Sequence, residues 1–457
     1  MFETALTGRS ATRLLRTVGD GEVERFNERL ARARELLRGR TIVHINSTAE
    51  GGGVAELLRS NLGYLSEALA VRWLIFEGDP RFFQITKRIH NRLHGDLGDF
   101  GSLGPEERAH YDAVTAENLA AARSFVQPGD VVVVHDPQPL GLVPGLVEHG
   151  AHVVWTCHVG VDTANDVMRS AWEFLLPFAR AAAATTFTRR AYVWEGLDQD
   201  GVAVIPPCID PLSLKNVDLE PDRCQAIMSR TGLGDGSARR DAVFERLDGA
   251  TDRVVRRADM LELAPVPAGA PIVTQVSRWD RLKDPAGVLH GFADDPGLDG
   301  VHLILAGPSP SSVADDPEAE SVLSDLRDTW LSQPVSKRER IHIANLPTAD
   351  VDENAIIVNA LQRRSNVVTQ KSLAEGFGLT VTEAMWKERP MVAGRVGGIA
   401  DQIEDGVQGL LVDPRDLQGF GEAVRSLFLD KHRADALGRA AKQRVRDRFL
   451  PPQYLGA

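Results

Sequence analysis

Short apolar segments alternate with helical segments along the first half of the chain, and this alternation constrains the fold more than any other feature. Strands are predicted at 41–46, 71–76, 130–135, 152–157 and 202–205, and helices at 22–39, 54–69, 105–126 and 170–183. Strands that alternate with helices indicate a parallel sheet that is covered by helices on both faces. The first half therefore predicts one α/β unit, which ends near the two prolines at 206–207.

A second series of the same kind follows a charged stretch at 229–262, which we interpret as a helix and a mobile loop. Strands are predicted at 271–277, 301–306, 340–344, 366–369, 390–393 and 409–412, and residues 415–449 are predicted to be helical. Two such series predict two Rossmann-like, doubly wound domains that face each other across a cleft. The predicted division is 1–210, 211–430 and a helical segment at 431–457 that could pack back on the first domain.

Composition limits the classes of partner. The chain has 457 residues and no apolar run near the roughly 20 residues that span a bilayer, and its N-terminus lacks a signal-peptide pattern, so we expect a cytoplasmic protein without a membrane partner. A net charge of −12 gives no general attraction to nucleic acid, so a phosphate-bearing ligand needs a local basic site. The three cysteines lack C-x-x-C spacing, which argues against disulfides and structural zinc.

The segment 372–385 places two carboxylates, Glu375 and Glu383, on either side of a glycine-flanked turn that begins an apolar helix. Backbone N–H groups at a helix N-terminus can bind a diphosphate. Carboxylates before the turn and about two helical turns later can accept hydrogen bonds from hydroxyl groups at the two ends of a sugar nucleotide. An ordinary loop with surface acids is the alternative for this segment.

Two cations in the segment 277–285 could supply the local basic site. Arg278 offers a planar guanidinium and Lys283 a mobile ammonium, which together suit a leaving diphosphate. The alternative is a capped helix start with surface cations. The glycines at 51–53, which include Gly52 and Gly53, follow a strand and would let the backbone approach a ligand, or would only form a tight turn. G-x-G-x-x-G and P-loop patterns are absent from the sequence, which disfavours hydride transfer and P-loop chemistry.

Polar residues also follow two predicted strands of the first half. Asp136, Gln138, His158 and Asp162 could hold a polyhydroxylated molecule there, although a histidine at a strand end is as often structural. Alternating acids at 198–200 and 350–352 are better explained as solvated loop residues than as a metal site.

The combined pattern resembles retaining glycosyltransferases of family 4, which have the GT-B architecture. The resemblance rests on the glycine loop, on Arg278 and Lys283, and on the E-x7-E element from Glu375 to Glu383. The segments 44–58, 135–139 and 205–213 look more narrowly like the trehalose glycosyltransferring synthases. Those enzymes make α,α-trehalose from a nucleoside-diphosphate glucose and glucose, and retaining trehalose phosphorylases are their close relatives.

The resemblance implies a role for each candidate residue. Arg278 and Lys283 would hold the diphosphate, Glu375 would contact the transferred sugar, and Glu383 would bind the ribose hydroxyls. His158 would contact the donor sugar near its 6-hydroxyl. Further donor contacts would come from Gly52, Gly53, Gly376, Phe377, Gly378, Leu379 and Thr380, and acceptor contacts from Asp136, Gln138 and Asp162.

The resemblance also implies the reaction. We expect a retaining glucosyltransferase that forms α,α-trehalose from ADP- or UDP-glucose and glucose in a reaction that could be reversible. The first domain would lie on the acceptor side, and the second would bind the sugar nucleotide. A trehalose phosphorylase, another family 4 hexosyltransferase and a non-catalytic sugar-nucleotide sensor are the alternatives. No tightly bound cofactor and no divalent metal are expected. The chain could form a homodimer. The long 229–262 stretch and the short end at 451–457 depart from the expected pattern.

Overall fold

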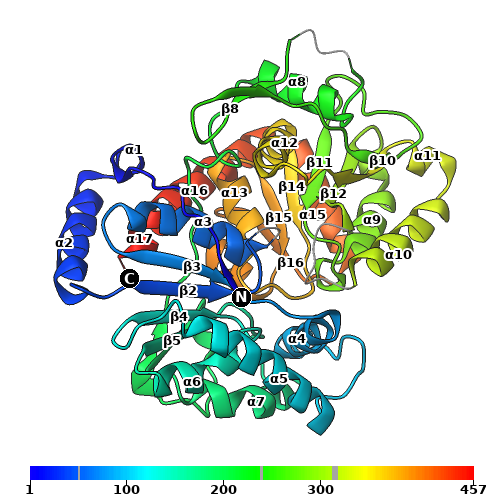
Figure 1. Ribbon diagram of the computed structural model, residues 1–457. Coiled ribbons are helices and arrows are strands. Elements are labelled where there is room, and N and C mark those ends of the chain that lie inside the picture. Colours follow the sequence, from blue (N-terminus) through cyan, green and yellow to red (C-terminus); the bar gives the residue numbers. More distant parts are fainter. Residues whose placement is uncertain (50–51, 237–239, 311–317, 457) are drawn as a thin grey trace.

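The computed structural model describes residues 1–49, 52–236, 240–310 and 318–456. Gly51 of the predicted glycine loop therefore lies outside the described residues. The described residues form two seven-stranded sheets and a separate two-stranded sheet. The first sheet belongs to the blue-to-green half and the second to the green-to-orange half (Figure 1).

The N-terminal sheet is parallel except at one edge, where the first strand runs antiparallel to its neighbour. Its strand order is β1 (Phe2–Glu3), β3 (Val71–Ile75), β2 (Ile42–Asn46), β4 (Val131–His135), β5 (His152–Cys157), β6 (Ala184–Phe187) and β7 (Val202–Val204). The helices of this lobe are α1 (Ala11–Leu15), α2 (Asp20–Leu36), α3 (Gly53–Ser66), α4 (Pro80–Leu93), α5 (Pro105–Ala122), α6 (Val143–Glu148) and α7 (Asp166–Ala179). In Figure 1, α3 lies on one side of the sheet and α5 to α7 on the other.

The C-terminal sheet repeats this plan, again with one antiparallel edge strand. Its strand order is β10 (Asp259–Leu261), β13 (Ile341–Leu346), β12 (His302–Pro308), β11 (Ile272–Val276), β14 (Val367–Gln370), β15 (Met391–Gly394) and β16 (Leu410–Val412). Its helices are α8 (Pro221–Thr231), α9 (Pro285–Ala293), α10 (Ala319–Leu331), α11 (Val335–Arg338), α12 (Val351–Arg364), α13 (Leu379–Trp386), α14 (Gly397–Gln402) and α15 (Leu417–Leu429). Short 3-10 turns occur at Leu140–Leu142, Arg190–Tyr192, Gln199–Gly201, Arg281–Lys283 and Pro296–Leu298.

Both sheets have a point where the strand order reverses. The reversal lies between β2 and β4 in the first sheet and between β11 and β14 in the second. In sheets of this kind a ligand binds beyond the carboxyl ends of the two strands at the reversal. The segments that follow these four strands carry most of the predicted site residues, so the fold brings the predicted motifs to the expected edges.

The prediction of a helix and a mobile loop at 229–262 is wrong, because this stretch contains short β-strands. α8 ends at Thr231, and an antiparallel hairpin of β8 (Val243–Glu245) and β9 (Thr251–Arg253) follows it, before β10 joins the sheet edge. Residues 237–239 of this stretch lie outside the described residues. The hairpin strands are only three residues long, Val-Phe-Glu and Thr-Asp-Arg, so they are too short to show the apolar alternation by which strands are recognised.

The C-terminal helices connect the two lobes. α16 (Lys431–Arg448) packs on α13, and α17 (Pro451–Leu455) then contacts α2 of the N-terminal lobe. The red end of the chain therefore returns to the blue region (Figure 1). The division at 1–210, 211–430 and 431–457 stays a prediction. No described helix is both long and apolar enough to cross a membrane.

Candidate active site

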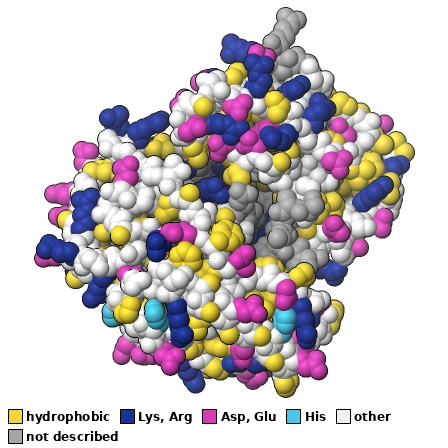
Figure 2. Space-filling model, in the orientation of Figure 1, with side chains coloured by type: hydrophobic (Ala, Val, Ile, Leu, Met, Phe, Trp, Pro, Cys, Tyr) yellow, Lys and Arg dark blue, Asp and Glu magenta, His cyan; other side chains and the backbone are white. Residues whose placement is uncertain are grey.

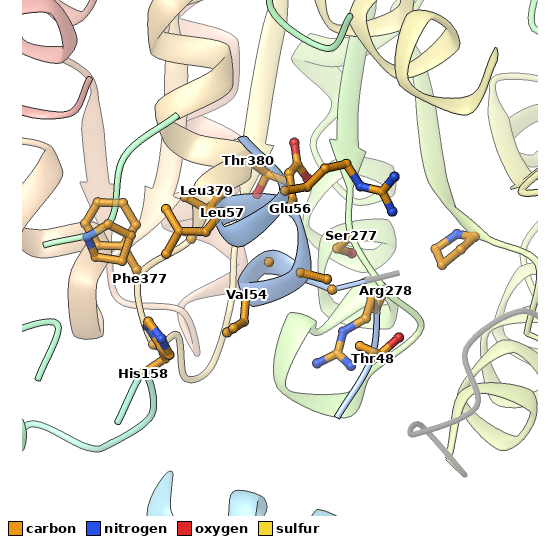
Figure 3. A pocket seen from close by; sticks show the side chains of 18 of the residues that line it. Thr48, Val54, Glu56, Leu57, His158, Ser277, Arg278, Phe377, Leu379 and Thr380 are labelled. Carbon is orange, nitrogen blue, oxygen red and sulfur yellow. The ribbon is translucent and has the colours of Figure 1, made fainter. Parts of the chain in front are cut away.

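A cavity of about 720 Å³ lies between the lobes and is lined by residues of both. The surface is hollowed at this place (Figure 2). Residues of both lobes, among them Val54, His158, Arg278 and Leu379, surround the pocket in the close view (Figure 3). The structure brings nearly all predicted site residues to this cavity, namely Gly52, Gly53, Asp136, Gln138, His158, Arg278, Lys283, Glu375, Gly376, Phe377, Gly378, Leu379, Thr380 and Glu383.

Asp162 is the exception. It is absent from the cavity lining formed by the described residues, and its carboxylate binds the guanidinium of Arg189 at 2.5 Å. The other carboxylate oxygen accepts a hydrogen bond from the backbone N–H of Gly397 at 3.1 Å. Arg189 also donates to Asp401 of the C-terminal lobe at 3.1 Å. Asp162 therefore holds the two lobes together, and we do not assign it to the acceptor.

Lys283 and Glu375 form an ion pair in the cavity. The Lys283 Nζ lies 2.8 Å from one carboxylate oxygen of Glu375 and 2.7 Å from the other. The hydroxyl of Ser372 donates to Glu375 at 3.1 Å. Gln275 at the centre of the sheet fixes both segments, because its amide donates to the Lys283 carbonyl at 2.8 Å and accepts from the Lys371 N–H at 3.0 Å. Strands β11 and β14 thus hold the pair in one geometry.

Glycine is required at two positions of the turn before α13. Gly378 precedes the helix with φ of +87°, a conformation that disfavours other residues. A Cβ on Gly376 would lie 2.4 Å from the carbonyl oxygen of His158, so the backbones of the two lobes approach closely there. Leu379 and Thr380 begin α13 and line the cavity, and N–H groups at the first positions of a helix can donate to an anion.

A buried carboxylate organises the cations opposite this turn. Asp280 is 1% exposed and lies 3.0 Å from Nζ of Lys87, a residue of α4, and 3.7 Å from the guanidinium of Arg278. Burial alone would raise the pKa of Asp280, but Lys87, Arg278 and Lys283 outweigh it and hold that pKa well below its usual range. Lys87 also pairs with Glu318 at 3.1 Å. Sequence patterns did not single out Lys87, which reaches the cavity only through the packing of the lobes.

Glu383 is buried in the wall of the cavity. It is 1% exposed, and burial raises the pKa of its carboxyl group. Lys215 lies 3.6 Å from one of its oxygens and also pairs with Glu56 of α3. The other oxygen, Oε2, has no hydrogen-bond partner among the described residues. A buried acceptor without a partner is costly unless a ligand donates to it, so Glu383 is suited to bind a ligand hydroxyl.

Three histidines form a row: His44 lies in the middle of β2, His135 ends β4 and His158 directly follows β5. His44 lies 2.9 Å from His135, and His135 lies 3.2 Å from His158, measured between ring nitrogens. The backbone N–H of His158 donates to the Asp136 carboxylate at 2.8 Å. Burial lowers the pKa of His158, and it lowers the pKa of His44 to about 4, so these rings are neutral at neutral pH. A neutral His158 can exchange hydrogen bonds with a sugar hydroxyl without adding charge.

Asp136 follows β4 with φ of +62°, which is unusual for a residue other than glycine. Its hydrogen bond from His158 fixes this conformation, and backbone strain of this kind concentrates at functional sites. Gln138 lines the cavity two residues later. These two residues remain the candidates for the acceptor side. No group of three or more His, Cys, Asp or Glu side chains that could hold a metal occurs among the described residues.

Two facing Rossmann-like lobes with a cavity between them form the GT-B architecture. Residues 44–194 match the family "Trehalose synthase, N-terminal domain", and residues 264–444 match "Glycosyl transferases group 1". Trehalose synthase of Rubrobacter xylanophilus is 36% identical over 92% of this chain and 89% of that protein. Trehalose synthase of Pyrococcus horikoshii is 34% identical over 96% and 92%. The chain belongs to the trehalose synthase family, as its motifs predicted, and is a trehalose-related glycosyltransferase.

More distant proteins share the fold. The trehalose phosphorylase of Pleurotus pulmonarius is 27% identical over 91% of this chain but only 55% of that protein. The solved α,α-trehalose-phosphate synthase of Burkholderia vietnamiensis has a TM-score of 0.65 at 17% identity, with coverage of 91% and 96%. An Anabaena protein in complex with UDP-glucose has a TM-score of 0.61 at 15% identity, with coverage of 91% and 98%. The predicted GT-B fold is therefore confirmed.

Proposed function

We propose that the protein is a retaining glucosyltransferase that forms α,α-trehalose from a nucleoside-diphosphate glucose and free glucose. The observation that carries this proposal is the convergence of Arg278, the Lys283–Glu375 ion pair and the buried Glu383 on one cavity. Cations suit the diphosphate, and each carboxylate suits a different set of hydroxyls. The names of the two similar trehalose synthases support the product.

Each residue has a stated role in this proposal. Arg278 and Lys283 bind the diphosphate, together with the N–H groups at the start of α13. Glu375 accepts hydrogen bonds from the transferred glucose, and Glu383 accepts from the ribose through its unpartnered oxygen. His158 contacts the donor glucose. Asp136 and Gln138 orient the acceptor glucose.

The acceptor hydroxyl attacks C1 of the donor glucose on the face from which the diphosphate leaves. The bond between C1 and the diphosphate oxygen breaks while the new C1–O bond forms, and the acceptor proton passes to the leaving phosphate oxygen. The products are α,α-trehalose and a nucleoside diphosphate. The protein contributes positioning and the positive charges of Arg278 and Lys283, which stabilise the charge that develops on the leaving group. This chemistry requires no metal ion.

Product analysis tests the proposal. The enzyme is incubated with glucose and either ADP-glucose or UDP-glucose, and NMR identifies the disaccharide and both anomeric configurations. In parallel, trehalose is incubated with phosphate or with a nucleoside diphosphate. The proposal expects α,α-trehalose in the first reaction and a nucleotide sugar in the second. Glucose 1-phosphate formed from trehalose and phosphate would instead identify a phosphorylase.

A further inference from the structure

The β8–β9 hairpin forms part of the cavity wall. Leu247, in the turn between the two strands, lines the cavity although its side chain is 42% exposed. Phe244 on β8 is 3% exposed and belongs to a core cluster that includes Ile227 of α8 and Ile356 of α12. In Figure 1 the hairpin lies beside α8 and above α12. The hairpin is therefore packed on the C-terminal lobe.

Charged contacts fix the hairpin to the start of α12. Arg246, next to Leu247, lies 2.5 Å from Asp350 and 3.4 Å from Asp352, and it also pairs with Asp252 at 2.6 Å. Asp350 is the N-cap of α12, and its contact with Arg246 lowers the pKa of its carboxyl group to about 2. These contacts set the position of the turn relative to the first turn of α12.

A second anchor follows the hairpin. Glu353 is 1% exposed and accepts hydrogen bonds from the backbone N–H groups of Val255 at 2.6 Å and Arg256 at 2.7 Å. The guanidinium of Arg256 contacts the same carboxylate. Removal of a buried carboxylate that accepts from several donors is strongly destabilising. The segment that follows the hairpin is therefore held as firmly as the turn of the hairpin.

The lining that comes from the hairpin, the end of β13 and the start of α12 differs chemically from the lining around Glu375. Its residues are largely apolar with a few polar groups, namely Leu247, Leu346, Thr348, Ala349, Val351, Asp352, Asn354, Ala355 and Val358. A heteroaromatic base needs flat apolar walls for its faces and a few polar groups for its edge. Glu375, Arg278 and Lys283 provide the charged part of the same cavity.

We propose that the β8–β9 hairpin is the outer wall of the nucleobase site, and that Leu247 determines how strongly the base is held and which base is preferred. This inference rests on the proposed function, because it assigns the base of the same donor. A purine presents a larger face than a pyrimidine, so truncation of Leu247 removes more contact from adenine than from uracil. Arg246 acts as a positioning residue, because its contacts with Asp350 and Asp352 hold Leu247 in the wall of the base site.

Calorimetric titration with ADP, UDP and pyrophosphate tests this assignment, because pyrophosphate has the charge but no base. Leu247→Ala is expected to weaken ADP binding by about fivefold and UDP binding by less, and to leave pyrophosphate binding unchanged. Arg246→Met should give the same base-dependent loss, with a circular dichroism spectrum that matches the unaltered protein. Leu263→Ala is the matched control, because Leu263 is 48% exposed but is not one of the residues that line the cavity.

The outcomes separate this inference from the proposed function. If the unaltered protein forms trehalose and binds both nucleotides, and Leu247→Ala and Arg246→Met keep all three affinities within about twofold, the hairpin assignment is overturned while the proposed function stands. An equal loss of pyrophosphate and ADP binding would also overturn it, since the effect would not depend on the base. Absence of nucleoside-diphosphate binding in the unaltered protein would overturn both.

Discussion

Replacement of Lys283 by alanine should reduce turnover far more than stability. Lys283 lies 2.8 and 2.7 Å from the two oxygens of Glu375, and its side chain is 17% exposed at the cavity. Loss of one charged contact that stabilises a leaving group costs about 3 kcal/mol, or roughly a hundredfold in rate. We therefore expect kcat for trehalose formation to fall by about two orders of magnitude.

The stability cost should be smaller for a structural reason. Breaking a fully buried ion pair costs about 3 to 5 kcal/mol, whereas exposed pairs contribute about 0 to 1 kcal/mol. Glu375 borders the cavity and keeps its hydrogen bond from Ser372 at 3.1 Å, so water can solvate the freed carboxylate. We expect about 1 to 2 kcal/mol from these limits.

The assay pairs initial rates at saturating donor with urea unfolding of the same preparations. The double variant Lys283→Met with Glu375→Gln should recover much of the lost stability without recovering turnover, because no unpaired charge remains. Lys442→Ala is the matched control, since Lys442 forms a 2.9 Å pair with Glu388 outside the cavity lining. Near-normal turnover of folded Lys283→Ala would remove Lys283 from the mechanism.

Two further predictions concern Glu383 and the buried histidines. Glu383→Gln should raise KM for the donor about tenfold, because a charge-assisted hydrogen bond to the ribose is weakened. Its melting temperature should also fall, because the buried carboxylate that faces Lys215 is lost. An unaltered KM of the folded variant would exclude Glu383 from donor binding. Burial lowers the pKa values of His44 and His94 to about 4, whereas the pKa of an unfolded histidine is near 6.5. Their contribution to stability is therefore complete above about pH 6.5 and is lost as the pH falls toward 4. The free energy of unfolding should fall by up to about 1.4 kcal/mol per pH unit for each such histidine. In urea titrations between pH 7 and 4.5, the free energy of unfolding of His44→Gln should decline less steeply than that of the unaltered protein. An equal decline in both proteins would contradict the lowered pKa of His44.

The sequence predicted the strands well because buried parallel strands are continuous apolar runs. The strand predicted at 152–157 matches β5, and that predicted at 71–76 differs from β3 by one residue. β6 was missed because Ala-Thr-Thr-Phe contains two threonines and lacks an apolar run. β8 and β9 were missed because contacts with α12, such as the pair between Arg246 and Asp350, hold them in place. Such contacts join residues about a hundred positions apart and leave no local pattern.

The site residues differ in the same way, because some follow local patterns and others depend on contacts between distant parts of the chain. Glu375, Glu383, Arg278 and Lys283 stand at fixed spacings after strands, so local patterns predicted that they would meet at the cavity. Lys87 and Lys215 could not be predicted in this way, because each reaches its partners from another part of the chain. The roles of the individual residues stay predictions until the variants are measured.

Lys87 and Lys215, which the sequence did not predict, also explain how the site is assembled. Lys87 of the N-terminal lobe binds Asp280 beside Arg278, and Lys215 joins Glu56 of the same lobe to Glu383. The Tyr192 hydroxyl donates to the backbone carbonyl of Glu375 at 2.7 Å. Each contact joins the two lobes through a residue of the cavity or its direct neighbour. Separation of the lobes would break these contacts, so the cations and carboxylates reach their observed arrangement only when the lobes are closed.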